Sequence, residues 1–344
     1  MNQEHSAHRF CVAPMLDHTD RHGRYFHRQL SHHARLYTEM VTTGALLFGP
    51  RERLLAFDEA EHPVALQLGG SEPADLAQSA RFGERAGYDE INLNCGCPSE
   101  RVQRGAFGAC LMAEPALVAD CVRAMRDAVS VPVTVKHRTG LDRAEEYGFL
   151  RDFVGIVAEA GCEVFIVHAR NAWLKGLSPR DNRTVPPLRY EVAARLKHDF
   201  PALTIVLNGG LRDHDAALAQ LVRVDGVMIG REACEHPWML AAVDQRYFGR
   251  PAPHATRESV LDAMRPYLRR ETATGVPVRA IVRHMLGLFN GLPGARHWRR
   301  TLSDPGLLAS AGPKGSDRLL DRALGSMRRG EPSAALRAHT AECP

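Results

Sequence analysis

The sequence has no run of about 18 consecutive apolar residues, so we expect no segment that crosses a membrane. Its first residues, Met1 to Arg9, are polar and lack the apolar centre of a secretory signal. We therefore expect a protein of the cytoplasm, without a membrane partner.

The spacings typical of metal sites are also missing. The cysteines form no CxxC pair, and no Cys/His cluster has zinc-site spacing, so no metal is expected. Most of them lie beside apolar residues and are expected to be reduced, buried and inert. The eight are Cys11, Cys95, Cys97, Cys110, Cys121, Cys162, Cys234 and Cys343.

Acidic residues are absent from Thr272 to Ser303, although the whole chain has a net charge of only +4. A charge this small does not by itself indicate nucleic-acid binding. A segment of one sign is usually a solvated face, but arginines around Trp298 would also suit an RNA backbone and exposed bases. The basic residues of the segment are Arg279, Arg283, His284, Arg296, His297, Arg299 and Arg300.

Short β-branched runs alternate with helical stretches, which predicts a parallel sheet. Eight βα units with nearly continuous apolar strands favour a closed (β/α)₈ TIM barrel over an open doubly wound sheet. The predicted strands are residues 10–15, 35–41, 63–69, 90–96, 131–138, 163–170, 203–210 and 226–231.

Strand signals stop after about Gly249, and residues 251–256 have the composition of a linker. The remaining sequence has helical periodicity. We therefore predict a catalytic barrel domain over residues 1–250 and a smaller, all-helical C-terminal domain over residues 255–344.

Nearly every predicted strand ends in polar or small residues that do not suit a packed core. Active sites of this fold are built at the carboxyl ends of the strands. A single polar residue there would mean little, but eight strand ends together imply a dense network or a polar ligand. The residues are Pro14, Met15, Glu39, Gln67, Asn92, Asn94, Cys97, Lys136, Arg138, His168, Arg170, Asn208, Gly209, Gly210, Gly230 and Arg231.

Two glycine-bearing turns, Gly209-Gly210 and Gly230-Arg231, follow predicted strands seven and eight. Phosphate sites recur at these positions in barrels, because glycine lets backbone N–H groups approach the phosphate and arginine adds charge-assisted bonds. Either turn alone could be only a tight βα connection. Their occurrence at both positions favours a phosphorylated cofactor.

Several motifs resemble the tRNA-dihydrouridine synthases, and in particular their subfamily A. They lie between residues 11 and 300, and two of them, LSPRDNR and GLFNGLPGARHWRR, indicate the subfamily. The others are CVAPMLDHTDRHGRYF, LYTEMVTTGALL, HPVALQLGG, GYDEINLNCGCPSERVQRGAFGACLM, VPVTVKHRTG, FIVHAR, LNGG and DGVMIGREA.

The resemblance implies an FMN-dependent enzyme that uses NADPH to reduce tRNA uridines, at D-loop positions 20 and 20a. Hydride would pass from FMN N5 to C6 of uracil, and Cys97 would protonate C5. An ordinary thiol suits this role because it stays protonated near neutral pH and can still donate. The implied FMN contacts are Pro14, Met15, Gln67, Lys136, His168, Asn208, Gly209, Gly210, Gly230 and Arg231.

The resemblance also implies contacts to tRNA. Asn94 would orient the target base, and the helical domain would bind the tRNA. The subfamily contacts would be Arg180, Arg183, Arg296 and Arg299. The chain departs from the family pattern at His18, where tryptophan is frequent, and at Cys95, where an apolar residue is common.

Three other functions remain open from the residues. Lys136 at a strand end could form an imine, as in a Schiff-base aldolase. A flavin reductase of the dihydroorotate or enoate type would share the cofactor residues but would not explain the acid-free basic segment. A non-catalytic flavin- or RNA-binding module could reuse the same scaffold.

Overall fold

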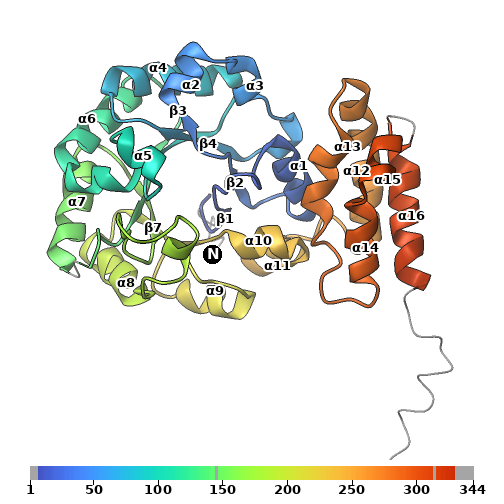
Figure 1. The fold of residues 1–344 in the computed structure, drawn as a ribbon. Coiled ribbons are helices and arrows are strands. Elements are labelled where there is room, and N and C mark those ends of the chain that lie inside the picture. The colour runs from blue at the N-terminus through green and yellow to red at the C-terminus, as the bar shows by residue number, and fades with distance from the viewer. Residues whose placement is uncertain (1–6, 144–145, 313–314, 330–344) are drawn as a thin grey trace, which may run out of the picture.

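The computed structural model describes residues 7–143, 146–312 and 315–329. Its centre is a closed barrel of parallel strands inside a ring of helices (Figure 1). The barrel closes because β1 pairs with both β2 and β9, while β2 also pairs with β4. The predicted (β/α)₈ barrel is therefore confirmed. Its strands are β1 (Phe10–Val12), β2 (Arg35–Tyr37), β3 (Val41–Thr42), β4 (Val64–Gly69), β5 (Glu90–Cys95), β6 (Val133–Arg138), β7 (Val164–His168), β8 (Thr204–Asn208) and β9 (Gly226–Ile229).

The predicted second strand, residues 35–41, is divided into β2 and β3. The division has a local cause at Thr38, whose hydroxyl accepts a hydrogen bond from the backbone nitrogen of Gln67 at 2.9 Å. A side chain therefore takes the place of a backbone partner at this point of the β4 ladder. Pairing resumes at Val41, opposite Leu68.

Helices cover the outside of the barrel and follow the strands along the chain. They are α1 (Arg21–Leu30), α2 (Thr43–Phe48), α3 (Arg51–Leu55), α4 (Pro73–Ala86), α5 (Glu100–Arg104), α6 (Pro115–Arg126), α7 (Tyr147–Glu159), α8 (Tyr190–Asp199), α9 (His214–Gln220), α10 (Arg231–Glu235) and α11 (Val243–Phe248). Short 3₁₀ segments are η1 (Glu59–Glu61), η2 (Gly108–Ala113), η3 (Asp181–Arg183), η4 (Pro237–Ala242) and η5 (Arg283–Met285). Among the described residues, no helix is long and apolar enough to cross a membrane.

A block of helices after residue 256 stands beside the barrel. It consists of α12 (Arg257–Ala273), α13 (Val278–Val282), α14 (Ala295–Leu302), α15 (Pro305–Ser310) and α16 (Ser316–Arg329). The predicted C-terminal domain extends to residue 344, and its residues 313–314 and 330–344 lie outside the described ones, as does Cys343. Residues 1–6 and 144–145 of the predicted barrel domain are likewise outside them.

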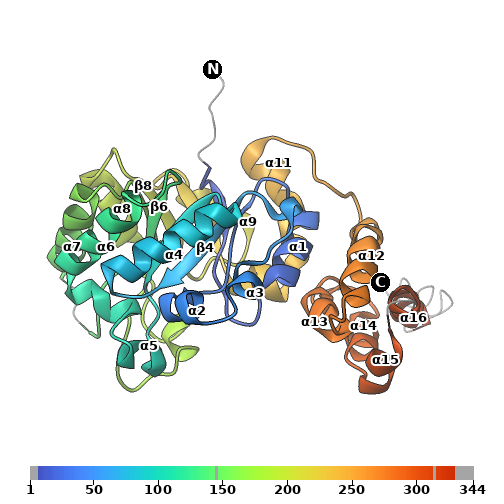
Figure 2. The ribbon, with the colours of Figure 1, turned by 90° about the horizontal axis from the view of Figure 1, so that it is seen from above.

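The helical block packs on α1, as Figure 2 shows. Tyr25 of α1 stacks on Tyr267 of α12 with ring centroids 3.7 Å apart. The hydroxyl of Tyr267 also lies 2.7 Å from Nδ1 of His22. Beside them, Arg21 forms an ion pair of 2.8 Å with Glu271. Aromatic stacking and ion pairs together fix where the block sits relative to the barrel mouth.

Side chains alternate between the two faces of each strand. On β5, Ile91, Leu93 and Cys95 belong to the large apolar core between strands and helices. Glu90, Asn92 and Asn94 alternate with them and therefore face the barrel interior. The interior also holds a small apolar cluster, composed of Cys11, Ala13, Tyr37, Ala65, Ile166, Val206 and Met228.

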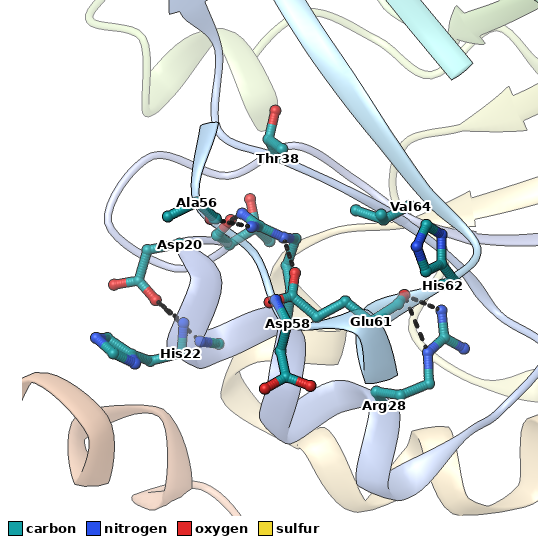
Figure 3. Close-up of polar contacts among 12 residues, drawn as sticks. Asp20, His22, Arg28, Thr38, Ala56, Asp58, Glu61, His62 and Val64 are labelled. Carbon is teal, nitrogen blue, oxygen red and sulfur yellow. Dashed lines mark hydrogen bonds and ion pairs between the residues drawn. The ribbon is translucent and has the colours of Figure 1, made fainter. Parts of the chain in front are cut away.

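Polar contacts connect α1 to the segment before β4 (Figure 3). The Asp20 carboxylate caps the helix by accepting a hydrogen bond from the backbone nitrogen of His22 at 3.0 Å. Arg24 donates from Nε to the buried Glu61 carboxylate at 2.6 Å, and Arg28 donates to the Glu61 carbonyl at 2.8 Å. These bonds hold the first βα connection in a defined position at the barrel mouth.

Candidate active site

A cavity of about 1050 Å³ opens at the carboxyl ends of the barrel strands. This is large enough for a cofactor together with a nucleobase. Most of the predicted site residues lie in its wall, from seven different strands or strand ends. They are Pro14, Met15, Gln67, Asn94, Cys97, Lys136, His168, Arg183, Asn208, Gly209, Gly210, Gly230 and Arg231.

Gly209 and Gly210 form a tight turn after β8. Both have positive φ angles, +114° and +70°, which L-residues rarely adopt. A Cβ on Gly209 would lie 2.8 Å from Cδ2 of His168, and one on Gly210 would lie 2.6 Å from Leu188. Tyr190 donates from its hydroxyl to the Gly209 carbonyl at 2.6 Å and holds the turn. Both positions therefore require glycine, and their backbone lines the cavity without a side chain.

Lys136 reaches the cavity from β6 without a protein counter-ion. Among the described residues its amine forms no hydrogen bond or ion pair, although the side chain is half-buried. Burial, together with the charges of Arg138 and Arg183, lowers the pKa of the amine to about 7. A cavity wall with several cations and a destabilised ammonium group favours an anionic ligand.

His168 at the end of β7 is neutral at physiological pH. Burial lowers its pKa well below the ordinary value, and Arg138, Lys136 and Arg170 lower it further. Its neighbour Asn208 is fixed, since its amide donates to the Met228 carbonyl at 2.8 Å. His168 can therefore offer a neutral imidazole to a ligand.

Cys97 lies just beyond β5, in a loop tied to the strand by Asn94. The amide oxygen of Asn94 accepts hydrogen bonds from the backbone nitrogens of Gly96, at 3.0 Å, and Cys97, at 2.9 Å. The thiol is half-buried, borders the cavity and lies 3.6 Å from the hydroxyl of Ser99. Asn94 thus holds the loop that carries a nucleophilic or acidic sulfur at the cavity.

Cys95, two residues earlier, has a different environment. It is fully buried in the outer core, and burial raises the pKa of its thiol well above the ordinary value. The departure from the family pattern at this position is therefore a packing substitution, because a buried and protonated thiol is unreactive. His18, the other departure, is exposed and does not border the cavity.

Arg138 has a bracing role that the sequence did not reveal. Its guanidinium donates to the carbonyl of Gly96 at 3.0 Å and to that of Asn182 at 2.8 Å. It thus connects the Cys97 loop with the loop after β7, which carries Arg183. Only tertiary structure brings these carbonyls to one side chain.

The predicted tRNA contacts do not all lie in the cavity. Arg183 borders it, whereas Arg180, Arg296 and Arg299 are exposed outside it. Trp298, around which the basic residues of this segment cluster, has no exposed ring surface on which a base could stack. Trp298 is fully buried, donates from its indole nitrogen to the Met285 carbonyl at 3.0 Å, and packs edge-on against Phe289.

Comparison with known proteins identifies the family. The model of the family described as "Dihydrouridine synthase (Dus)" matches residues 11–321. The chain belongs to the dihydrouridine synthase family. These enzymes are flavin-dependent oxidoreductases that act on tRNA, and the predicted activity, reduction of tRNA uridine to dihydrouridine, is thereby confirmed.

Curated relatives agree over most of their length. The chain is 61% identical to a tRNA-dihydrouridine(20/20a) synthase of Pseudomonas aeruginosa, over 86% of this chain and 89% of that protein. It is 58% identical to the Vibrio parahaemolyticus protein of the same name, over 86% and 91%. The Escherichia coli K12 protein of that name is also 58% identical, over 87% of each chain.

A solved structure shows the same fold at low identity. A 2-naphthoyl-CoA reductase in complex with 2-naphthoyl-CoA superposes with a TM-score of 0.53 and 11% identity. The match covers 71% of this chain and 50% of that one. This likeness concerns the fold of the dihydrouridine synthase chain alone.

The cavity fits a flavin mononucleotide in two respects. The turn at Gly209 and Gly210 presents backbone without side chains at the cavity wall, as a phosphate requires. Lys136, which has no protein counter-ion among the described residues, can pair with an electron-rich ring edge or an anion. Both features lie in the same cavity as Cys97.

Proposed function

We propose that this dihydrouridine synthase binds FMN, takes electrons from NADPH and reduces D-loop uridines 20 and 20a. The observation that carries the proposal is the meeting of Cys97, Asn94, Lys136 and the Gly209 turn at one cavity. The names of relatives at about 60% identity support the two tRNA positions.

FMN would be held by residues from most of the strands. Gly209, Gly210, Gly230 and Arg231 would bind the phosphate, and Lys136 would pair with the N1/O2 edge of the ring. Gln67 would meet the pyrimidine edge, and His168 would contact the ring or the phosphate. Pro14, Met15 and Asn208 complete the proposed set. When bound and reduced, FMN supplies a hydride for C6 of the uracil.

The substrate base must leave its stack to reach a barrel mouth. D-loop bases, being partly unpaired, cost less to extract than paired ones. Asn94 would orient the base, and the Sγ–H of Cys97 would give its proton to C5 on the side opposite the hydride. Proton transfer to C5 neutralises the charge that hydride addition places on C5 and O4.

The tRNA body would lie across the barrel mouth and the helical block, which we assign as a tRNA-binding domain. The exposed arginines Arg180, Arg296 and Arg299, together with Arg183, would contact phosphates. Because its substrate is tRNA, we place the protein in the cytoplasm.

The proposal is tested by purifying the protein and identifying its flavin by chromatography after denaturation. Dihydrouridine is then mapped in tRNA from cells that lack the protein, before and after treatment with protein and NADPH. We expect FMN, and loss and restoration of dihydrouridine at positions 20 and 20a only. A colourless protein on which borohydride traps a substrate at Lys136 would instead indicate an aldolase. Flavin reduction without dihydrouridine formation would indicate a small-molecule reductase or a binding module.

A further inference from the structure

A continuous chain of polar side chains runs through the barrel interior, from its amino-terminal end to the Cys97 loop. It consists of Glu90, Thr134, Asn92, Gln67 and Asn94. The Thr134 hydroxyl lies 2.6 Å from Glu90 Oε1, and Asn92 Nδ2 lies 2.8 Å from that hydroxyl. Gln67 Nε2 lies 2.7 Å from Asn92 Oδ1, and Asn94 Nδ2 lies 2.8 Å from Gln67 Oε1.

The strand register produces this arrangement. Asn92 pairs with Gln67 of β4 on one side and with Thr134 of β6 on the other, so these three side chains form one layer of the barrel. Glu90 and Asn94 lie on the same face of β5, one layer below and one above. Asn94 is 9% exposed and the other four at most 1%, so water cannot readily replace their mutual hydrogen bonds.

The lower end of the chain accepts hydrogen bonds only. Oε1 of Glu90 receives hydrogen bonds from Thr134 and from the Tyr37 hydroxyl at 2.7 Å, and Oε2 lies 2.7 Å from His8 Nε2. Burial by itself would raise the pKa of Glu90, but His8, Arg35 and Thr134 lower it to about 2. Thr134 must therefore donate toward Glu90 and accept from Asn92.

The upper end of the polar chain, at Asn94, requires the same assignment of hydrogen-bond donors and acceptors. Gly96 and Cys97 present two backbone N–H donors, so Asn94 must turn its oxygen toward them and its NH₂ toward Gln67. Gln67 then accepts from Asn94 and donates to Asn92. An acceptor at one end and donors at the other leave a single pattern in which every bond is made.

We infer that Glu90 is a positioning residue for the active site, which orients the amides of Gln67 and Asn94 through Asn92 and Thr134. The value of this orientation rests on the proposed function, because Gln67 and Asn94 are the amides that would meet the flavin and the base. With this orientation, each amide keeps one N–H that can serve a ligand acceptor in the cavity.

Glu90→Gln reverses the hydrogen bond between residue 90 and Thr134 at the lower end of the chain. The oxygen of the new amide favours the side of His8 and Arg35, which leaves its NH₂ toward Thr134. Thr134 must then donate to Asn92, and both Asn92 and Gln67 must turn over. Asn94 would finally turn its NH₂ group toward the backbone N–H groups of Gly96 and Cys97. The variant therefore either reverses the hydrogen bonds up to the cavity or leaves one of them unmade.

The experiment compares holoenzyme variants for FMN dissociation constant and for the rate of dihydrouridine formation with unmodified tRNA. We expect Glu90→Gln and Thr134→Val each to weaken FMN binding by roughly 3- to 10-fold, the equivalent of one hydrogen bond. Thr134→Ser keeps the hydroxyl and should have the FMN dissociation constant and the rate of the wild-type protein. Tyr37→Phe is the matched control, because it removes a hydrogen bond to Glu90 outside the chain and should change stability without changing FMN binding.

The double variant Glu90→Gln/Thr134→Val distinguishes an effect carried along the hydrogen-bonded chain from two independent disturbances of the barrel interior. If the chain carries the effect, the double variant binds FMN no worse than Thr134→Val alone. Additive losses, or equal losses in Glu90→Gln and Tyr37→Phe, would overturn the inference. If Glu90→Gln does not fold, the comparison of FMN binding between Thr134→Val and Thr134→Ser tests the inference.

A measurement on the flavin-free protein keeps this test distinct from the proposed function. The amide resonances of Gly96 and Cys97 should shift in Glu90→Gln and Thr134→Val and stay in place in Tyr37→Phe. If the wild-type protein binds no FMN while the variants show these shifts, the cofactor is refuted and the positioning role of Glu90 is intact. Unchanged resonances in an FMN-binding protein would refute the positioning role alone.

Discussion

The amide oxygen of Asn94 accepts a hydrogen bond from the backbone nitrogen of Cys97 at 2.9 Å. The bond joins the last inward-facing residue of β5 to the loop that follows. Because Asn94 is itself held by Gln67, the position of the Cys97 thiol depends on the barrel interior as well as on its own loop. A proton donor gains from such a fixed position, since proton transfer requires contact at hydrogen-bond distance.

Replacing Cys97 with alanine should slow dihydrouridine formation by about 10²- to 10⁴-fold, the range for loss of a general acid. FMN content and flavin reduction by NADPH should be unchanged, because the thiol acts only on the uracil. Rates are measured in single-turnover reactions of pre-reduced enzyme with unmodified tRNA. Cys110→Ala is the control, since Cys110 is also half-buried but does not border the cavity. Equal rates in both variants would refute the acid assignment.

FMN binding should take up a proton near neutral pH. In the ligand-free protein burial and neighbouring arginines lower the pKa of Lys136 to about 7, so the amine loses its proton as pH rises through 7. A bound anion would raise that pKa, and affinity should therefore fall as pH increases above 7.

Calorimetry of FMN binding in buffers of different ionisation enthalpy measures this uptake. Lys136→Met should abolish it and weaken binding by roughly 10- to 100-fold, as expected for a lost charge-assisted bond. Lys197→Met provides the control, because Lys197 pairs with Asp225 away from the cavity. Uptake that persists in Lys136→Met would assign the proton to another group.

Gly209→Ala should weaken FMN binding and destabilise the protein. The positive φ costs about 1–2 kcal/mol for an L-residue, and the new Cβ would lie 2.8 Å from the His168 ring. Gly275→Ala separates the two effects, since Gly275 has a φ of +92° and no atom within 4 Å of the position that its Cβ would take. We expect both variants to lose stability in urea unfolding, and only Gly209→Ala to lose FMN. Comparable FMN affinities in the two would show that the turn does not approach the ligand.

Asp20→Asn should loosen the helical block from the barrel. The carboxylate pairs with Arg283 at 2.7 Å and His284 at 2.9 Å, both from the block. We expect the free energy of unfolding in urea to fall by about 1–2 kcal/mol. Because asparagine caps helices as well as aspartate does, this loss measures the ion pairs and not the cap. Affinity for tRNA should fall more than affinity for FMN, because the residues proposed to hold FMN lie at the strand ends of the barrel and not in the block.

The pH dependence of this stabilisation has a defined sign. Burial would raise the pKa of Asp20, but the hydrogen bond and charge of His284 lower it below its ordinary value. The stabilisation is therefore present above the ordinary aspartate pKa and is lost as pH falls through the folded one. Asp213→Asn is the control, a capping aspartate of α9 without an ion pair among the described residues. An equal loss in both variants would mean that capping alone is measured.

Much of the fold and of the site could be predicted from the chain. Alternating βα periodicity sufficed for a barrel, because apolar runs of strand length and helices between them leave few other packings. Polar residues at strand ends located the cavity, since parallel strands all direct their carboxyl ends to one rim. For these reasons Lys136, His168 and Gly209 could be assigned to one site before any distance was known.

The sequence by itself determined the barrel fold, the family and most of the residues at the barrel mouth, because these depend on local periodicity and on motif. It did not determine that Trp298 is buried, that Arg138 braces two loops, or that Glu90 lies at the end of a polar chain leading to Cys97. Those relationships join residues far apart in the chain through strand register and domain packing. Only the tertiary structure decides them, because a hydrogen bond depends on distance and direction in space, and neither follows from the spacing of residues along the chain.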